Sequence, residues 1–109
     1  GRCLIINGKL VAFAPAGITE FTVPNSVTEI GEYAFYWCKS LTSVTIPNSV
    51  TTIGEWAFSC CFDLESVTIP NSVKTIDDSA FYQCDNLLEE TKKSIISINP
   101  NCIITPCDV

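Results

Sequence analysis

Cysteine is the side chain of this sequence with the greatest capacity for chemistry. The chain has seven cysteines in 109 residues, and a thiolate can act as a nucleophile, a metal ligand or a disulfide partner. The sequence contains no histidine, so the cysteine and serine triads that use an imidazole base are excluded. No Cys-x-x-Cys pair is present, and a zinc site is therefore not indicated.

Three of the cysteines, Cys38, Cys61 and Cys84, recur at intervals of 23 residues, each three residues after an Ala-Phe pair. We expect them to be free thiols buried in an apolar core. The alternative is a disulfide between neighbours, since bridged Cα atoms lie roughly 4.4 to 6.8 Å apart. Cys102 and Cys107 are a candidate pair for closing a small C-terminal loop.

Carboxylates are the second group that could do chemistry. Glu32, Glu55 and Asp78 share the same 23-residue spacing, and carboxylates held close together could bind calcium or shift one another's pKa. The alternative is an acidic stripe exposed to solvent, which we expect here. No Gly-rich phosphate loop accompanies these residues. The sequence therefore predicts no enzyme, no cofactor and no metal site.

Aromatic residues offer a binding surface instead. Tyr33, Tyr36, Trp37 and Trp56 are candidate ligand-binding residues, because clustered aromatic side chains often anchor protein or sugar ligands. The residues Ala34, Phe35 and Cys38 between them are expected to point inward, which leaves some of the aromatics exposed. The acidic column beside them favours a ligand with basic or hydroxyl groups. The alternative is that these aromatics only pack on adjacent coils.

A row of threonines is the secondary candidate. Thr22, Thr45 and Thr68 are expected to line the outer face of three strands, together with Glu20 and two serines. Threonine is also what β propensity alone favours on a solvated strand face, so this row has a structural explanation too.

These candidates are positioned by a repeat without insertion or deletion. Residues 18–40, 41–63 and 64–86 align residue for residue. Self-similarity at a fixed period of this length is typical of stacked architectures, in which neighbouring units complete one another's core. We therefore expect a solenoid of three coils.

Each coil begins with a predicted strand. Apolar and polar residues alternate before a proline that cannot donate to a strand ladder, so short parallel strands should stack about 4.8 Å apart. The spacing of Val27 and Ile30 predicts an extended or irregular return path. Gly31 and Gly54 then permit a bend, and Asp77, which replaces glycine in the third copy, is a residue type that can tolerate a left-handed conformation there.

The last part of each coil has apolar residues at positions i, i+1 and i+4, as in Ala34-Phe35-x-x-Cys38. This spacing defines one side of a helical turn. The sequence thus predicts an α/β solenoid with strands on one side and short helical turns on the other.

The repeat resembles the leucine-rich repeat of BspA-like bacterial surface proteins, whose pattern is roughly LxxVxIPxSVxxIGxxAFxxCxx. The resemblance covers residues 18–86, with Ile18 for the first leucine and Asp77 for glycine as the departures. It implies a right-handed solenoid and a non-catalytic role, such as adhesion to host matrix proteins or to other bacteria. A glycan-binding module and a structural spacer that displays a neighbouring domain are the alternatives.

Both ends of the repeat array are predicted to be capped within a single domain, residues 1–109. Residues 1–17 contain Asn7-Gly8 between two apolar runs, a strong signal for a hairpin that can cover the first coil. Residues 87–109 are predicted to begin with a helix. Asn86, followed three residues later by Glu89, is the start signal of this helix, and Pro100 marks its stop. Residues 102–105 are expected to add a last strand.

Charge and composition exclude further classes. Twelve acidic residues against six basic ones give a formal net charge of −6, which makes nucleic acid and anionic membranes poor partners. No apolar run approaches the roughly 18 residues of a membrane span. The chain starts within an apolar pattern, which favours a piece of a longer secreted protein. We expect a monomer that is extracellular or at the cell surface.

Overall fold

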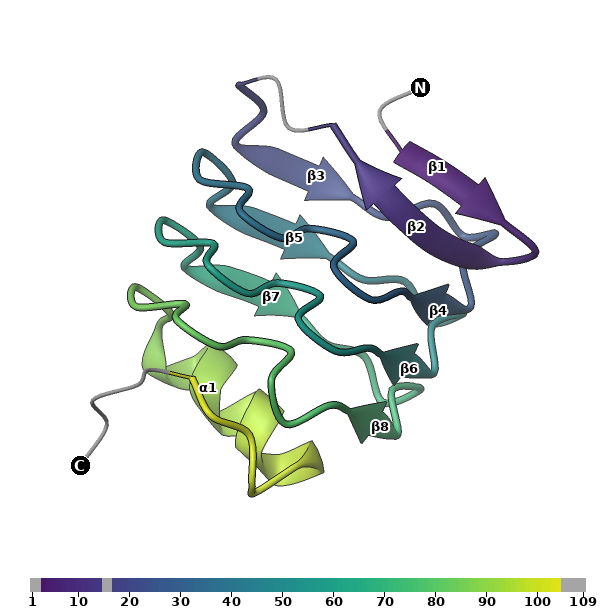
Figure 1. Cartoon of the computed structure of the whole chain (residues 1–109). Helices are drawn as coiled ribbons and strands as arrows, with labels where there is room; N and C mark the ends of the chain where they lie inside the picture. Colours follow the sequence, from purple (N-terminus) through teal and green to yellow (C-terminus); the bar gives the residue numbers. More distant parts are fainter. Residues whose placement is uncertain (1–2, 15–16, 105–109) are drawn as a thin grey trace.

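The structure of the protein is a computed structural model that describes residues 3–14 and 17–104. Three strands, β3 (Glu20–Thr22), β5 (Ser43–Thr45) and β7 (Ser66–Thr68), form a parallel sheet in the order β3-β5-β7 (Figure 1). Each residue pairs with the one 23 positions further along, as Val44 does with Val67. This in-register stack of short parallel strands confirms the prediction from the alternating pattern.

A second sheet forms where the sequence predicted an extended or irregular path. The strands β4 (Glu29–Ile30), β6 (Thr52–Ile53) and β8 (Thr75–Ile76) are parallel and in register. The strands β2 (Lys9–Phe13) and β1 (Cys3–Ile6) extend this sheet to the order β1-β2-β4-β6-β8. Each coil therefore contributes one strand to each of two sheets.

The predicted N-terminal hairpin is present, and its strand β2 joins the second sheet. Asn7 and Gly8 have φ angles of 50° and 81°, the positive values that a tight two-residue turn needs. The backbone of β2 pairs with β4, not with the β3 edge of the first coil. The Phe13 ring reaches the β3 side, 4.6 Å from the ring centroid of Phe21. Residues 1–2 and 15–16 of the predicted N-terminal cap lie outside the described residues.

Gly31 and Gly54 allow neighbouring backbones to approach each other closely, and neither adopts a left-handed conformation. A Cβ on Gly31 would lie 2.8 Å from the carbonyl oxygen of Leu10, which accepts the Gly31 amide. Asp77 occupies this column with an ordinary φ, so the left-handed conformation that it could tolerate is not used there. The left-handed residues lie two positions later, at Tyr33 (φ 60°) and Trp56 (φ 57°).

The segments with the Ala-Phe pair are successive turns, so the predicted short helical turns are wrong. Left-handed residues interrupt each segment, and the backbone amides alternate between two kinds of partner. Phe35 and Trp37 donate to Ala57 and Ser59 of the next coil, at 2.7 and 3.0 Å. Tyr36, between these two residues, donates within its own coil to Tyr33 at 3.2 Å, and Cys38 after them donates to Phe35 at 3.2 Å. An α-helix would satisfy its amides internally, whereas these turns connect coil to coil.

The core is a stack of equivalent side chains. Phe35, Phe58 and Phe81 are fully buried, and their parallel rings follow one another at centroid distances of 4.8 and 5.0 Å. The alanine and cysteine columns are buried beside them. The inward direction predicted for the Ala-Phe-x-x-Cys pattern is confirmed, although its helical conformation is not.

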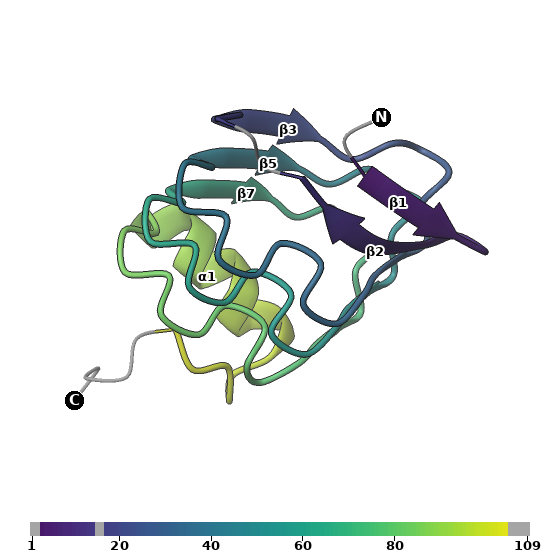
Figure 2. The same cartoon turned by 45° about the horizontal axis from the view of Figure 1, so that its top comes forward.

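The C-terminal helix α1 spans Glu89–Ile98, at the end of the stack opposite the hairpin (Figure 2). Its N-cap is Leu88 and no side chain caps it, so the predicted start at Asn86 is wrong. Thr91 and Ile95 are its buried residues, and they face the third coil. Among the described residues, no helix is long and apolar enough to cross a membrane.

The residues after α1 return to the turn side of the third coil. Ile103 donates its amide to Asp78 at 2.9 Å, and Cys84 donates to the Ile104 carbonyl at 3.2 Å. These bonds replace contacts that a following coil would make. Residues 102–104 do not form the predicted strand, and residue 105, the last of that prediction, and Cys107 lie outside the described residues.

Candidate interaction surface

The four aromatic candidates lie together on the turn side, and we call Tyr33, Tyr36, Trp37 and Trp56 the aromatic strip. The Tyr33 and Tyr36 rings meet edge to face at 5.3 Å, and the Tyr36 and Trp37 rings do so at 6.1 Å. The three residues are 52%, 41% and 44% exposed. The expectation that some of these aromatics are exposed is therefore confirmed.

The neighbour relations within the strip differ from those expected of a helix. No direct contact joins Tyr33 to Trp37 in the described structure; Tyr36 lies between them. Trp56 is half-buried, stacked parallel to Tyr33 at 6.4 Å and edge to face with Tyr82 at 5.5 Å. Packing on adjacent coils thus buries part of the Trp56 side chain, as the alternative reading expected, but it leaves the other three side chains accessible.

Trp37 is contacted from two further sides. The Phe62 ring of the second coil meets it edge to face at 5.4 Å. The ammonium group of Lys39 lies 4.9 Å from the Trp37 ring centroid, within the range of a cation–π contact. Lys39 is exposed and forms no ion pair with any other described residue.

The acidic column lies beside the strip, because Glu32 precedes Tyr33 and Glu55 precedes Trp56. The backbone also joins the two positions, since the Tyr33 amide donates to the Glu55 carbonyl at 3.0 Å. Glu32 and Glu55 are exposed and have no cationic partner among the described residues. Asp78 of the same column accepts a bond from Asn99 at 2.7 Å instead. Within the described ranges, no group of three ligand-type side chains could hold a metal ion.

The threonine row, Thr22, Thr45 and Thr68, is exposed and aligned by the register of the three-stranded sheet. Its hydroxyl groups make no hydrogen bond to the described protein atoms, so they face solvent as expected. They remain the secondary binding candidate.

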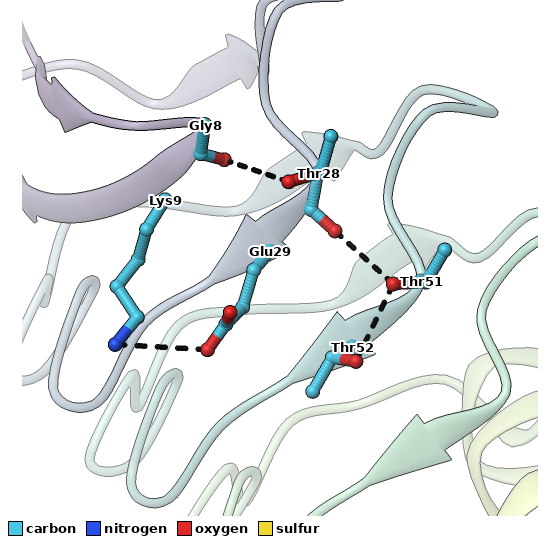
Figure 3. A network of polar contacts seen from close by, with 6 residues as sticks. All are labelled: Gly8, Lys9, Thr28, Glu29, Thr51 and Thr52. Carbon is cyan, nitrogen blue, oxygen red and sulfur yellow. Dashed lines mark hydrogen bonds and ion pairs between the residues drawn. The ribbon is translucent and has the colours of Figure 1, made fainter.

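A different set of threonines ties the coils together. The Thr28 hydroxyl donates to the Gly8 carbonyl at 3.3 Å, and the Thr51 hydroxyl donates to the Thr28 carbonyl at 3.4 Å (Figure 3). A salt bridge of 3.7 Å joins Lys9 of β2 to Glu29 of β4 beside them. These contacts connect the hairpin to the coils, so we assign this column to structure and not to binding.

The cysteine column is free and buried, as predicted. The Cys61 thiol donates to the Phe35 carbonyl at 3.0 Å, and the Cys84 thiol donates to the Phe58 carbonyl at 2.9 Å. Burial raises the pKa of Cys84, because a thiolate there would lose its hydration. Burial likewise raises the pKa of Cys102 to about 11. A protonated thiol with a raised pKa is a poor nucleophile.

We expect Cys38, Cys61 and Cys84 to resist thiol reagents in the native protein and to react only after unfolding. Because the pKa of Cys84 is higher in the folded state than in the unfolded state, its stabilising effect is complete below about pH 8 and declines as the pH rises further. Thiol titration at neutral pH and denaturant melts from neutral to alkaline pH measure both effects. Rapid labelling of the whole column, or a bridge mapped within it, would contradict the expectation.

The structure also contains a groove that the sequence did not predict. A cavity of about 490 Å³ lies between the third coil and α1. Its apolar residues include Ile69, which is half-buried, whereas Ile46 in the same column of the second coil is 2% exposed. The groove forms because α1 fills the end of the stack less completely than a coil does. The only sequence signal is the end of the repeat after residue 86. The residues that line the groove are Ile69, Pro70, Asn71, Val73, Lys74, Ser94, Ser97 and Ile98.

Repeated parallel strands, a 23-residue register and a stacked phenylalanine core together define a leucine-rich repeat protein. Comparison with protein families gives the more specific assignment. Residues 9–108 match the model described as "BspA type Leucine rich repeat region (6 copies)", and the chain belongs to this family. The resemblance seen in the repeat is therefore confirmed. A search of curated proteins found no significant match.

Several solved bacterial structures are similar to this chain. A leucine-rich repeat protein of T. pallidum is 30% identical, with a TM-score of 0.69 over 72% of this chain and 39% of that one. A leucine-rich cell surface protein of Faecalibacterium prausnitzii is 33% identical, with a TM-score of 0.65 over 72% of this chain and 24% of that one. A Bacteroides ovatus leucine-rich repeat protein is 34% identical, with a TM-score of 0.61 and coverages of 73% and 23%. The chain thus spans well under half the length of each.

Proposed function

We propose that this chain is a non-catalytic protein-binding module of a bacterial cell-surface or secreted protein, and that it binds through the aromatic strip. One observation carries the proposal: Tyr33 and Trp37 are large, each packs on Tyr36, and all three side chains are still about half exposed. Aromatic side chains of this kind are enriched among residues that dominate binding energy. Membership of the family and the F. prausnitzii cell surface protein support the setting. Adhesion to host matrix or bacterial surface proteins is the role we propose.

The rigid backbone beneath the aromatic strip supports the same function. The backbone beneath the strip is held to the next coil by amide bonds from Tyr33, Phe35 and Trp37, at 3.0, 2.7 and 3.0 Å. A backbone that is already held in place needs no further ordering when a partner binds, which lowers the entropic cost of association. A glycan ligand is less well matched, because Tyr33 and Trp56 stack on each other and leave less ring face open to a sugar.

The repeat array, the N-terminal hairpin and the C-terminal helix together form the scaffold that we propose for the aromatic strip. We propose one domain, residues 1–109, in which three coils (18–86) form a right-handed solenoid between an N-terminal cap (1–17) and a C-terminal cap (87–109). The pairing of β2 with β4 and the packing of α1 on β7 and β8 support this arrangement. With both ends covered, the protein is expected to be a monomer.

Removal of a central aromatic side chain should weaken partner binding by about thirtyfold or more, equivalent to about 2 kcal/mol. The partner is first identified by pull-down from host matrix or bacterial surface proteins, with a glycan array beside it. Trp37→Ala and Trp56→Ala are then compared with wild type by titration, after their melting curves show that they are folded.

The triple change Thr22→Ala/Thr45→Ala/Thr68→Ala is the matched control, because it alters an exposed row on the other face of the same coils. Loss of binding in this triple variant, with normal binding by both tryptophan variants, would move the site to the strand face. Selective glycan binding without a protein partner would favour the glycan alternative, and no ligand of either class would favour the spacer.

A further inference from the structure

Lys39 suggests what kind of group the aromatic strip accepts. Its ammonium group lies 4.9 Å from the Trp37 ring centroid, although Lys39 is exposed and has no carboxylate partner in the described ranges. A free lysine side chain can sample many conformations in water, so its position over the ring indicates that this ring face is favourable to a cation.

The acidic residues beside Tyr33 and Trp56 give the strip a charge that is complementary to a cation. Glu32 and Glu55 beside the strip are exposed and have no cationic partner among the described side chains. The whole chain carries a formal net charge of −6. An approaching basic segment is therefore attracted to this side of the molecule, while Lys39 is the basic residue that it meets at the ring.

We propose that the Trp37 ring is a binding position for an arginine or lysine side chain of a basic partner segment, and that Lys39 is an intramolecular competitor that the partner's cation displaces. This inference rests on the proposed function, since it names the chemistry of the partner at the same strip. The consequence is unusual for an exposed lysine on a binding surface. Its removal strengthens binding, while removal of the ring that it covers weakens binding.

The experiment uses the intact domain and a labelled peptide of alternating glycine and arginine, with the same peptide carrying neutral citrulline as the reference. We expect Lys39→Gln to bind the arginine peptide about two- to fivefold more tightly than wild type, the size of one exposed cation–π contact. Lys93→Gln is the matched control, because it removes the same charge from an exposed position on α1. Trp37→Leu should remove the preference for arginine over citrulline.

Equal affinities of Lys39→Gln and Lys93→Gln would overturn the proposal, because the gain would then come from net charge alone. No preference of the wild type for arginine over citrulline would also overturn it. Both outcomes leave the proposed function standing if Trp37→Ala still loses the partner found by pull-down. Normal binding of that partner by Trp37→Ala would count against the proposed function instead.

Discussion

Replacement of Phe58 by alanine is expected to lower the free energy of unfolding by about 3 to 5 kcal/mol, the usual cost of emptying a large core site. The Phe58 ring is fully buried between Phe35 and Phe81, with parallel rings at 4.8 and 5.0 Å. Because neighbours on both sides are themselves fixed by the stack, the cavity cannot close by a small shift of one coil. Denaturant melts measure the loss.

Thr45→Ala in the same coil is the control, and it should change the free energy of unfolding by less than about 0.5 kcal/mol, as surface substitutions usually do. Thr45 is exposed and its hydroxyl has no partner among the described residues. Small and equal losses in the two variants would contradict the stacked phenylalanine core.

The second large effect concerns the junction of the hairpin with the first coil. Gly31→Ala is expected to lower the free energy of unfolding by about 1 to 3 kcal/mol, as overpacking does. Its new Cβ would lie 2.8 Å from the Leu10 carbonyl oxygen, a backbone atom that cannot move without disturbing the pairing of β2 with β4. Denaturant melts give the size of the effect, and amide hydrogen exchange in residues 9–13 locates it.

Gly54→Ala tests the same column one coil further on. Its Cβ would meet backbone atoms of the first coil, 3.2 Å from the Ile30 carbonyl oxygen and 3.3 Å from the Glu32 amide nitrogen, so this backbone must shift by a few tenths of an ångström. Replacing glycine by alanine also restricts the unfolded chain, which favours folding by about 0.4 to 1 kcal/mol where the conformation is allowed. The Gly54 variant should therefore lose less stability than the Gly31 variant. If Gly31→Ala is equally stable, the hairpin does not depend on this close approach.

The sequence predicted the stacking better than it predicted the local conformation. The repeat aligned the strand columns, and Val44 and Val67 pair in the predicted register. The two-residue strands of the second sheet were missed, because a strand as short as Glu29–Ile30 has no alternation to detect. Its formation depends on partners in other coils, which a local pattern does not describe.

The helical turns were predicted wrongly for a related reason. Apolar residues at i, i+1 and i+4 fit one side of a helix, but they fit a series of turns equally well. The left-handed conformation of Tyr33 and Trp37 decides between them, and neither residue type favours it. Bonds to the next coil, such as the one from Phe35 to Ala57, stabilise that conformation. Exposure of the aromatic candidates was predicted from the inward columns, whereas the contact of Lys39 with Trp37 was not.

Alternate amides of the turns donate to the next coil, and this pattern recurs in the following coil. Gene duplication can therefore lengthen the chain by whole 23-residue coils. The bond from Phe35 to Ala57 is repeated from Phe58 to Ala80, one coil later and at the same length of 2.7 Å. An inserted copy of residues 41–63 would meet an equivalent neighbour on each side and leave the coils at the two ends unchanged. A single in-frame duplication could thus add a coil and a further aromatic position at one step.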